Sequence, residues 1–202
     1  MKRLVFFSLL ASLFIGTAPA QADISKLITG NQASPEAITA LRFGQKFVWV
    51  FYHAPSVRDP KTNEKRKIFG PGALQADGTI WRLGADYATV LHTDADLDIG
   101  GLAVPKGDYT LYAELSNGNW KLIVNKQLND AKRNRPIWGV LNAKGDSTND
   151  PATELGRTAL TMGKSATPVE TLKITLAPVD PTHGKLNIAW EYVTASVPFT
   201  VK

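Results

Sequence analysis

The sequence contains no cysteine, and this absence excludes several kinds of chemistry. Disulfide bridges, thiolate nucleophiles, thiolate metal ligands and the lipidated cysteine of a bacterial lipoprotein all require a cysteine side chain. A domain without disulfides must be stabilised by packing. A chain of 202 residues is long enough to bury a substantial core in this way.

Histidine is scarce, and no recognisable metal or nucleotide motif is present. None of the three histidines, His53, His92 and His183, lies at metal-ligand spacing from another. The segment from Asp94 to Gly100 resembles a calcium loop only in part, because its glycine comes one position late and Pro105 stands where glutamate is expected. Phosphate-binding, dinucleotide-binding and Gly-x-Ser-x-Gly motifs are also missing. We therefore expect no metal and no cofactor, and we assign no catalytic residue.

Long apolar runs are absent after the N-terminus. Two basic residues precede the apolar run 4–15, and small residues follow at Ala18-Pro19-Ala20. This pattern is typical of a secretory signal peptide and is short for a membrane span. We expect residues 1–20 to be the signal peptide, with cleavage after Ala20 or Ala22, and a product exported to the periplasm or the medium. A mature chain that spans a membrane is not expected.

The excess of positive charge is small. The formal net charge is +5, and it falls to +3 when Lys2 and Arg3 leave with the signal peptide. Such an excess favours adhesion to an anionic envelope but is well short of a nucleic-acid signature. Nucleic acid is therefore not an expected partner, and the sequence leaves the oligomeric state open.

Sustained helical periodicity is almost absent, and short β-like segments replace it. The run from Phe47 to Tyr52 is the strongest β-former and is apolar on both faces, which predicts a central strand buried on both sides. Residues 34–43 fit either a short helix capped by Ser34 or a strand, and the following strand favours the second interpretation. Gly100-Gly101 and Asn117-Gly118 predict tight hairpin turns.

The C-terminal half continues the same pattern. Residues 126–149 predict a long surface excursion that lays Trp138 on the domain, and Pro198 predicts that the last strand is an edge strand. The fold class expected is all-β, an antiparallel β-sandwich of jelly-roll or Greek-key type or a partly closed barrel. We expect a flexible mature N-terminus at 21–33 and a single domain at 34–202.

Several short motifs follow one another in a recognisable order. They are Tyr52-His53-Ala54-Pro55-Ser56, Lys67-Ile68-Phe69-Gly70, Trp81-Arg82-Leu83-Gly84-Ala85-Asp86-Tyr87-Ala88-Thr89, Pro105-Lys106-Gly107-Asp108-Tyr109-Thr110-Leu111, Trp120-Lys121-Leu122-Ile123-Val124-Asn125 and Trp190-Glu191. With these motifs the chain resembles the exported bacterial family of unknown function DUF2911, from about Ser34 to the C-terminus. The sequence departs from the family pattern at Ala54, where arginine is common, at Asp86, where asparagine is expected, and around Ala76-Asp77-Gly78. The resemblance implies a β-rich secreted domain and no established activity.

The densest mixture of aromatic, charged and glycine residues lies between Lys67 and Thr89. Arg82 and Asp86 stand there among apolar residues, where an unpaired charge would be costly. They either bind an anionic or sugar-like ligand, with Trp81, Tyr52 or Tyr87 as a stacking face, or form a charged pair that clamps the Gly84 corner. The ligand-binding candidates are Tyr52, His53, Arg66, Lys67, Trp81, Arg82 and Asp86.

Three functions remain open on this sequence. The favoured hypothesis is a non-enzymatic binding module for a small molecule, a glycan or an envelope component. The first alternative is a hydrolase-like enzyme with Asp86 or His53 as general base. The second alternative is a structural or partner-binding envelope domain.

Overall fold

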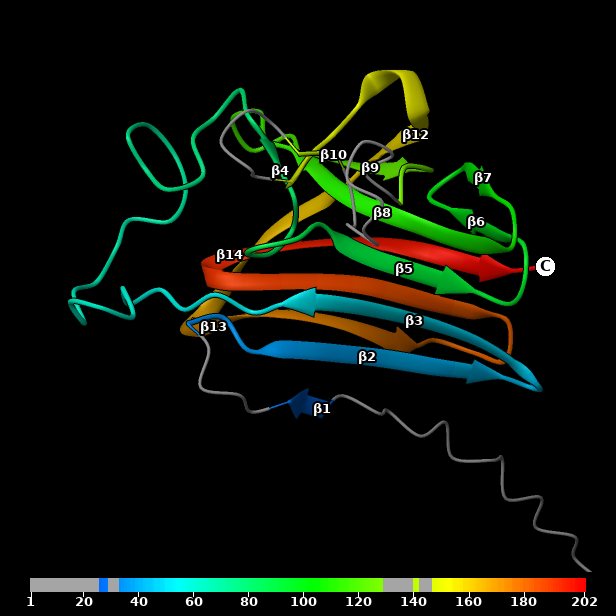
Figure 1. Ribbon diagram of the computed structural model, residues 1–202. Coiled ribbons are helices and arrows are strands. Elements are labelled where there is room, and N and C mark those ends of the chain that lie inside the picture. Colours follow the sequence, from blue (N-terminus) through cyan, green and yellow to red (C-terminus); the bar gives the residue numbers. More distant parts are fainter. Residues whose placement is uncertain (1–25, 29–32, 129–139, 142–146) are drawn as a thin grey trace, which may run out of the picture.

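Two antiparallel β-sheets form the protein, as a computed structural model shows for residues 26–28, 33–128, 140–141 and 147–202. The first sheet has the order β1 (Lys26–Ile28), β2 (Glu36–Phe43), β3 (Lys46–His53), β5 (Thr89–Thr93), β8 (Gly107–Glu114), β9 (Lys121–Asn125) and β12 (Glu154–Ala159), with β4 (Ile80–Trp81) paired to β8. The second sheet has the order β13 (Thr161–Pro178), β14 (His183–Val201), β6 (Leu97–Ile99) and β7 (Leu102–Val104). The remaining elements are a small ribbon of β10 (Val140–Leu141) and β11 (Ser147–Thr148) and the 3₁₀ turn η1 (Pro151–Thr153). Figure 1 shows the two sheets as the two layers of a sandwich that does not close into a barrel.

This architecture confirms the expected fold class. Residues 34–43 contain the strand β2 rather than a helix, because alternate side chains on it are buried and its neighbour β3 pairs with it along its whole length. The element β1 lies inside the segment expected to be a flexible mature N-terminus, and it pairs with β2. Most of the excursion at 126–149, including Trp138, lies outside the described residues.

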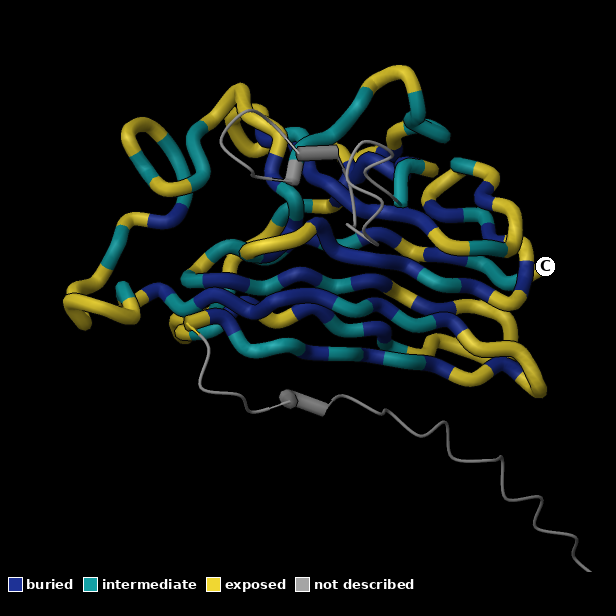
Figure 2. Tube along the Cα trace, in the orientation of Figure 1, coloured by how far each residue is buried: buried dark blue, intermediate teal, exposed yellow. Residues whose placement is uncertain are grey.

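The core lies between the sheets and follows the two-residue period of the strands. On β3, Val48 and Val50 point inward and are fully buried, and Figure 2 shows the alternation of buried and less buried residues along this strand. The outward residues differ, because Phe47 is 40% exposed and Trp49 and Phe51 are only partly buried. The prediction that β3 is buried on both faces is therefore wrong. It is central in its sheet, yet only its inner face meets the second sheet.

The predicted turns are confirmed where the sequence signals were strongest. Gly100 and Gly101 connect β6 and β7 with φ values of 55° and 88°, and Asn117 and Gly118 connect β8 and β9 with φ values of 27° and 80°. These left-handed conformations are the ones that two-residue hairpins require, and they favour glycine and asparagine.

The prediction that Pro198 marks an edge strand is wrong. Pro198 belongs to β14, which lies between β13 and β6 in its sheet. Its carbonyl accepts a hydrogen bond from the Gly100 N–H at 3.0 Å. The Gly100 carbonyl accepts a hydrogen bond from the Thr158 hydroxyl at 2.8 Å. This hydroxyl of β12 replaces the backbone N–H that proline lacks.

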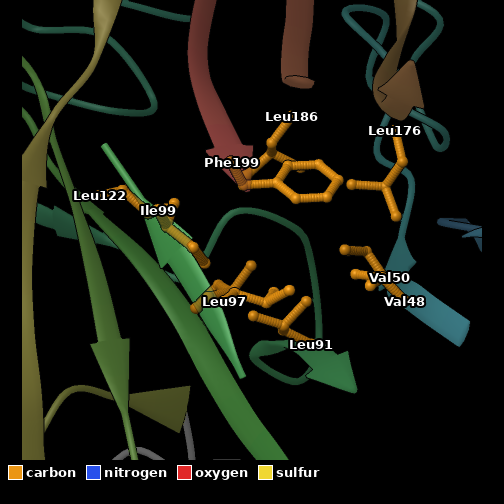
Figure 3. A pocket seen from close by; sticks show the side chains of 10 residues that line it. Val48, Val50, Leu91, Leu97, Ile99, Leu122, Leu176, Leu186 and Phe199 are labelled. Carbon is orange, nitrogen blue, oxygen red and sulfur yellow. The ribbon is translucent and has the colours of Figure 1, made fainter. Parts of the chain in front are cut away.

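A small gap remains between the two sheets. It has a volume of about 10 Å³ and is lined only by apolar side chains, among them Val50, Leu97, Leu122, Leu186 and Phe199. Figure 3 shows these side chains converging from both sheets. A cavity of this size holds at most a single water, and a purely apolar lining offers that water no hydrogen bond. The gap is a packing defect of the core rather than a ligand pocket.

The part of the chain that the structure describes contains no helix with the length and apolar composition of a membrane span.

Candidate functional site

The segment between β4 and β5 makes a tight corner, and backbone contacts define its shape. Leu83 and Asp86 both adopt positive φ, at 55° and 58°. The Trp81 indole N–H donates to the Gly84 carbonyl at 3.3 Å, and the Thr89 hydroxyl donates to the Leu83 carbonyl at 2.9 Å. A Cβ on Gly84 would lie 2.9 Å from the His53 carbonyl oxygen, so this position requires glycine. The motif that contains Trp81 and Gly84 therefore stabilises the corner between β4 and β5.

Two of the predicted ligand-binding residues belong to the core. Trp81 is 2% exposed and stacks on Trp190, with ring centroids 5.7 Å apart and an interplanar angle of 22°. Tyr52 is also buried, and its hydroxyl oxygen accepts a hydrogen bond from the Ile174 N–H at 3.0 Å. Burial raises the pKa of Tyr52, although its hydrogen bond to the Ile174 backbone opposes this effect. Neither ring presents a face on which a ligand could stack.

Arg66 and Lys67 bind carbonyl groups of their own loop. The guanidinium of Arg66 donates to the Ser56 carbonyl at 2.6 Å and lies 3.8 Å from the carboxylate of Asp59. The ammonium of Lys67 donates to the Pro71 carbonyl at 2.6 Å. Figure 1 shows that the loop between β3 and β4 projects from one end of the sandwich. These contacts order the projecting loop.

His53 and Asp86 are brought together at the outward end of β3. The carboxylate of Asp86 lies 3.2 Å from His53 Nδ1, and the carboxylate of Glu36 lies 4.0 Å from His53 Nε2. Within the described residues, the salt-bridge partner of Asp86 is thus His53 and not Arg82, which is partly buried at the same corner. The His53 side chain is only 8% exposed, whereas that of Asp86 is 57% exposed. The ring of His53 contacts Tyr87 edge-on at 5.7 Å.

A second histidine between two carboxylates lies on the same face, and the sequence interpretation missed it. His92 Nδ1 is 2.7 Å from Asp108, and His92 Nε2 is 3.1 Å from Asp94. Desolvation lowers the pKa of His92, but hydrogen bonds to Asp108 and Asp94 outweigh it and raise that pKa overall. The backbone N–H of Phe47 and the ring of His92 together lower the pKa of Asp94.

Four outward side chains of β3 connect these two histidine groups. Phe47, Trp49, Phe51 and His53 follow one another at every second position, and we call them the β3 row. The ring of His92 stacks on Trp49 at 4.9 Å and 14°. On its other side Trp49 pairs with Ala40 of β2, which has a small side chain.

The signal that could have found the β3 row was the alternation itself. The inner positions Val48 and Val50 are small aliphatic residues and Tyr52 follows them, whereas every outer position from Phe47 to His53 carries a ring. His92 and Asp108 are far apart in sequence and become neighbours only because β5 and β8 pair at that register. A single sequence does not supply that register.

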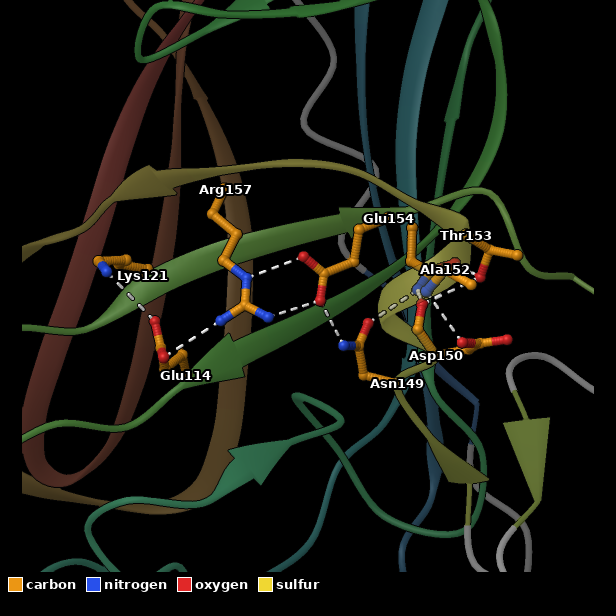
Figure 4. Close-up of polar contacts among 9 residues, drawn as sticks. Glu114, Lys121, Asn149, Asp150, Ala152, Thr153, Glu154 and Arg157 are labelled. Carbon is orange, nitrogen blue, oxygen red and sulfur yellow. Dashed lines mark hydrogen bonds and ion pairs between the residues drawn. The ribbon is translucent and has the colours of Figure 1, made fainter.

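A different polar cluster lies across β8, β9 and β12 (Figure 4). Arg157 makes two hydrogen bonds to Glu154, at 2.8 and 2.6 Å, and lies 3.1 Å from Glu114. Asn149 donates to Glu154 at 2.6 Å. The hydrogen bond from Arg157 is the main cause that lowers the pKa of Glu154. These charges are paired with one another, so the cluster fixes the segment around η1 and leaves little for a ligand.

No arrangement of three or more His, Cys, Asp or Glu side chains that could hold a metal ion occurs in the described part of the chain. The hydroxyl of Ser56 lies 3.4 Å from the Thr171 hydroxyl, so its hydrogen-bond partner belongs to β13. Among the residues described, His53 makes no hydrogen bond to a serine or threonine hydroxyl, and its polar neighbours are Glu36 and Asp86.

Comparison with known proteins gives one match. The model of a family described as "Protein of unknown function (DUF2911)" matches residues 34–199, and the chain belongs to this family. No curated protein and no solved structure matches the chain.

Proposed function

We propose that this protein is an exported, non-catalytic binding module, and that its ligand lies on the outward face of β2, β3 and β5. The observation that carries the proposal is the β3 row, which leaves aromatic side chains partly exposed on a sheet face that the second sheet does not cover. Exposed aromatic residues that gather on one face commonly mark an interaction site.

The chemistry of this face suits a ligand with both apolar and hydroxyl-bearing surfaces, such as a glycan or another envelope component. Aromatic rings combine a large apolar contact area with little conformational freedom, so they bind apolar faces of a ligand efficiently. Carboxylates at both ends of the row accept hydrogen bonds, and those of Asp86 and Asp108 are 57% and 47% exposed. The combination supports binding more than catalysis.

The location of the site differs from the one expected from sequence. His53 and Asp86 remain in it at one end of the β3 row. Trp81 and Tyr52 support it from the core, and Arg66 and Lys67 lie in the projecting loop. Trp49 and His92 take the place of Trp81 and Tyr52 as the ring surface.

A panel of defined oligosaccharides tests the binding role. We expect at least one neutral, N-acetylated or amine-bearing oligosaccharide to bind saturably and to raise the melting temperature, because a ligand that binds only the native state must stabilise it. Binding should be lost in Trp49→Ala and retained in Tyr192→Ala, since Tyr192 is an exposed aromatic residue of the other sheet. Two results would contradict the proposal. One is binding that persists in both Trp49→Ala and Phe51→Ala, and the other is the absence of binding to every oligosaccharide in the panel.

Export is tested separately. The full chain is expressed in a Gram-negative host, and the mass of the product is measured after cell fractionation. We expect a periplasmic or secreted product that begins at Gln21 or Asp23. An intact chain that begins at Met1 in the cytosol would contradict this part of the proposal.

A further inference from the structure

We propose that the ligand of this face is an extended glycan that carries free amino groups, an inference that rests on the binding role proposed above. The first observation is the distribution of negative charge. His53 lies between Glu36 and Asp86, and His92 lies between Asp94 and Asp108. Each group has two carboxylates and one imidazole, so each keeps a net negative charge whether or not the imidazole is protonated.

The four carboxylates remain accessible to a ligand. Their side chains are between 40% and 57% exposed although each contacts a histidine. The protein as a whole is basic, with a formal net charge of +5, so an acidic face of this kind is local. It favours a cationic ligand and repels phosphate, sulfate or uronate groups.

The spacing of the two groups favours an extended ligand. Trp49 is paired with His92 across the sheet, and His53 lies four residues further along β3. At about 3.4 Å per residue, the two groups are roughly 14 Å apart. Trp49 and Phe51 occupy the interval, and protonated amines are attracted to aromatic faces. A linear oligosaccharide can place sugar rings over the aromatic residues and amino groups beside the carboxylates.

The environment of His53 provides an independent observation. Its side chain is more than nine-tenths buried, yet among the described residues Nδ1 has no hydrogen-bond partner of good geometry, although Asp86 lies at ion-pair distance. A buried polar atom of this kind normally has a partner. An amine or hydroxyl of the ligand that enters between Asp86 and Tyr87 would supply it.

Among the described residues, two cations lie near the Phe47 end of the β3 row and are already engaged. The guanidinium of Arg42 lies over the ring of Phe47 at 5.7 Å and donates to the Gly44 carbonyl. Lys46 donates to the carbonyl of Lys202. Arg42 is level with Asp94, because Phe47 pairs with Arg42 and its N–H donates to Asp94. It offsets part of the charge of that carboxylate, and Asp108, Glu36 and Asp86 lie further along the row.

The test compares two trimers that differ only in the charge of their amino groups. Glucosamine trimer and N-acetylglucosamine trimer are titrated into the mature protein at pH 6.5 and low ionic strength. We expect the glucosamine trimer to bind more tightly, and we expect its advantage to shrink at high salt because exposed charges are screened. One carboxylate pair is then replaced, in Asp94→Asn/Asp108→Asn or in Glu36→Gln/Asp86→Asn. Each carboxylate removed should weaken the affinity for the glucosamine trimer about two- to fivefold.

Asp77→Asn serves as the matched control, because Asp77 is an exposed carboxylate in the loop before β4. It should leave the affinity for both trimers unchanged. Equal affinity for the two trimers, with both lost in Trp49→Ala, would overturn the inference about amino groups and leave the binding role standing. The inference would also be overturned if the glucosamine trimer does not bind the wild-type chain at all. The wider panel then decides the binding role on its own.

Discussion

His92 shows how one residue can connect charge, ring stacking and strand pairing. The pairing of β3 with β5 places its ring against Trp49, and the pairing of β5 with β8 places it beside Asp108. These contacts restrict the ring to one orientation between the two carboxylates. A histidine held in this way has a pKa that differs from its value in an unfolded chain.

We predict that His92 titrates above its ordinary pKa of 6.5 and that Asp108→Asn moves the midpoint down. A raised pKa means that the paired imidazolium stabilises the fold below about pH 6.5. This contribution is lost as the pH rises through the folded-state value. An NMR titration of the three histidine rings measures the midpoint, with Asp77→Asn as control. A His92 midpoint at or below 6.5 would contradict the geometry.

The role of Gly84 is set by the close approach of the His53 backbone. We predict that Gly84→Ala destabilises the protein by about 1–3 kcal/mol, because the new methyl group would lie 2.9 Å from the His53 carbonyl and the backbone must shift. Urea unfolding measures the change. Gly101→Ala is the comparison, since its methyl group meets no atom within 4 Å and tests only the cost of φ at +88°. An unchanged midpoint for Gly84→Ala would show that the corner is not tightly packed.

At the scale of elements, β3 explains both the success and the failure of sequence interpretation. Alternating Val48 and Val50 predict a strand with a buried inner face, and this is confirmed. The outer residues Phe47, Trp49 and Phe51 look equally apolar in sequence, so the strand reads as buried on both sides. Which face is covered depends on β13 and β14, more than a hundred residues later in the chain.

The candidate site was predictable only where it is local in sequence. Asp86 and His53 stand out in the sequence because both flank apolar runs, and they lie together in the fold. Trp81 reads in the sequence as a stacking face for a ligand, but a tryptophan ring suits a protein core as well as a binding surface. Its contacts with Phe69, Trp120 and Trp190 join segments that are distant in sequence, and no local pattern reveals them.

The aromatic cluster around Trp81 supports a prediction about the element that it anchors. Trp81→Ala should destabilise the protein by about 3–5 kcal/mol, because it empties a buried site between β4 and the second sheet. Tyr192→Ala, at an exposed ring, should change stability by about 0.5 kcal/mol or less. Equal losses in the two variants, measured by denaturant unfolding, would contradict the assignment of Trp81 to the core.

The turn between β13 and β14 depends on a single carboxylate. Asp180 accepts hydrogen bonds from the Thr182 N–H and from His183, and these lower its pKa from 3.8 to about 2. A lowered pKa means that the contribution to stability is present above pH 3.8 and is lost as the pH falls through about 2. Asp180→Asn should therefore be less stable than the wild type at pH 5, with a smaller difference at pH 2.5. A difference that does not depend on pH would contradict this account.

At the scale of the whole molecule, the two sheets are joined along both edges without any disulfide. At one edge β13 bonds to the segment after β3, where the Leu172 N–H donates to the Pro55 carbonyl at 2.9 Å. At the other edge Thr158 of β12 donates to the Gly100 carbonyl. These contacts hold the two sheets together, and the β3 row lies on the face of the first sheet that is turned away from the second.

The most direct test of the binding face is a map of where a ligand contacts the folded chain. Glucosamine trimer is titrated into the ¹⁵N-labelled mature protein, and the amide and indole shifts are followed in two-dimensional NMR spectra. We predict that the perturbed signals belong to β3 and β5, with the Trp49 indole among the largest. Shifts confined to the loop that carries Arg66 and Lys67, or to the outward face of β13 and β14, would contradict the account.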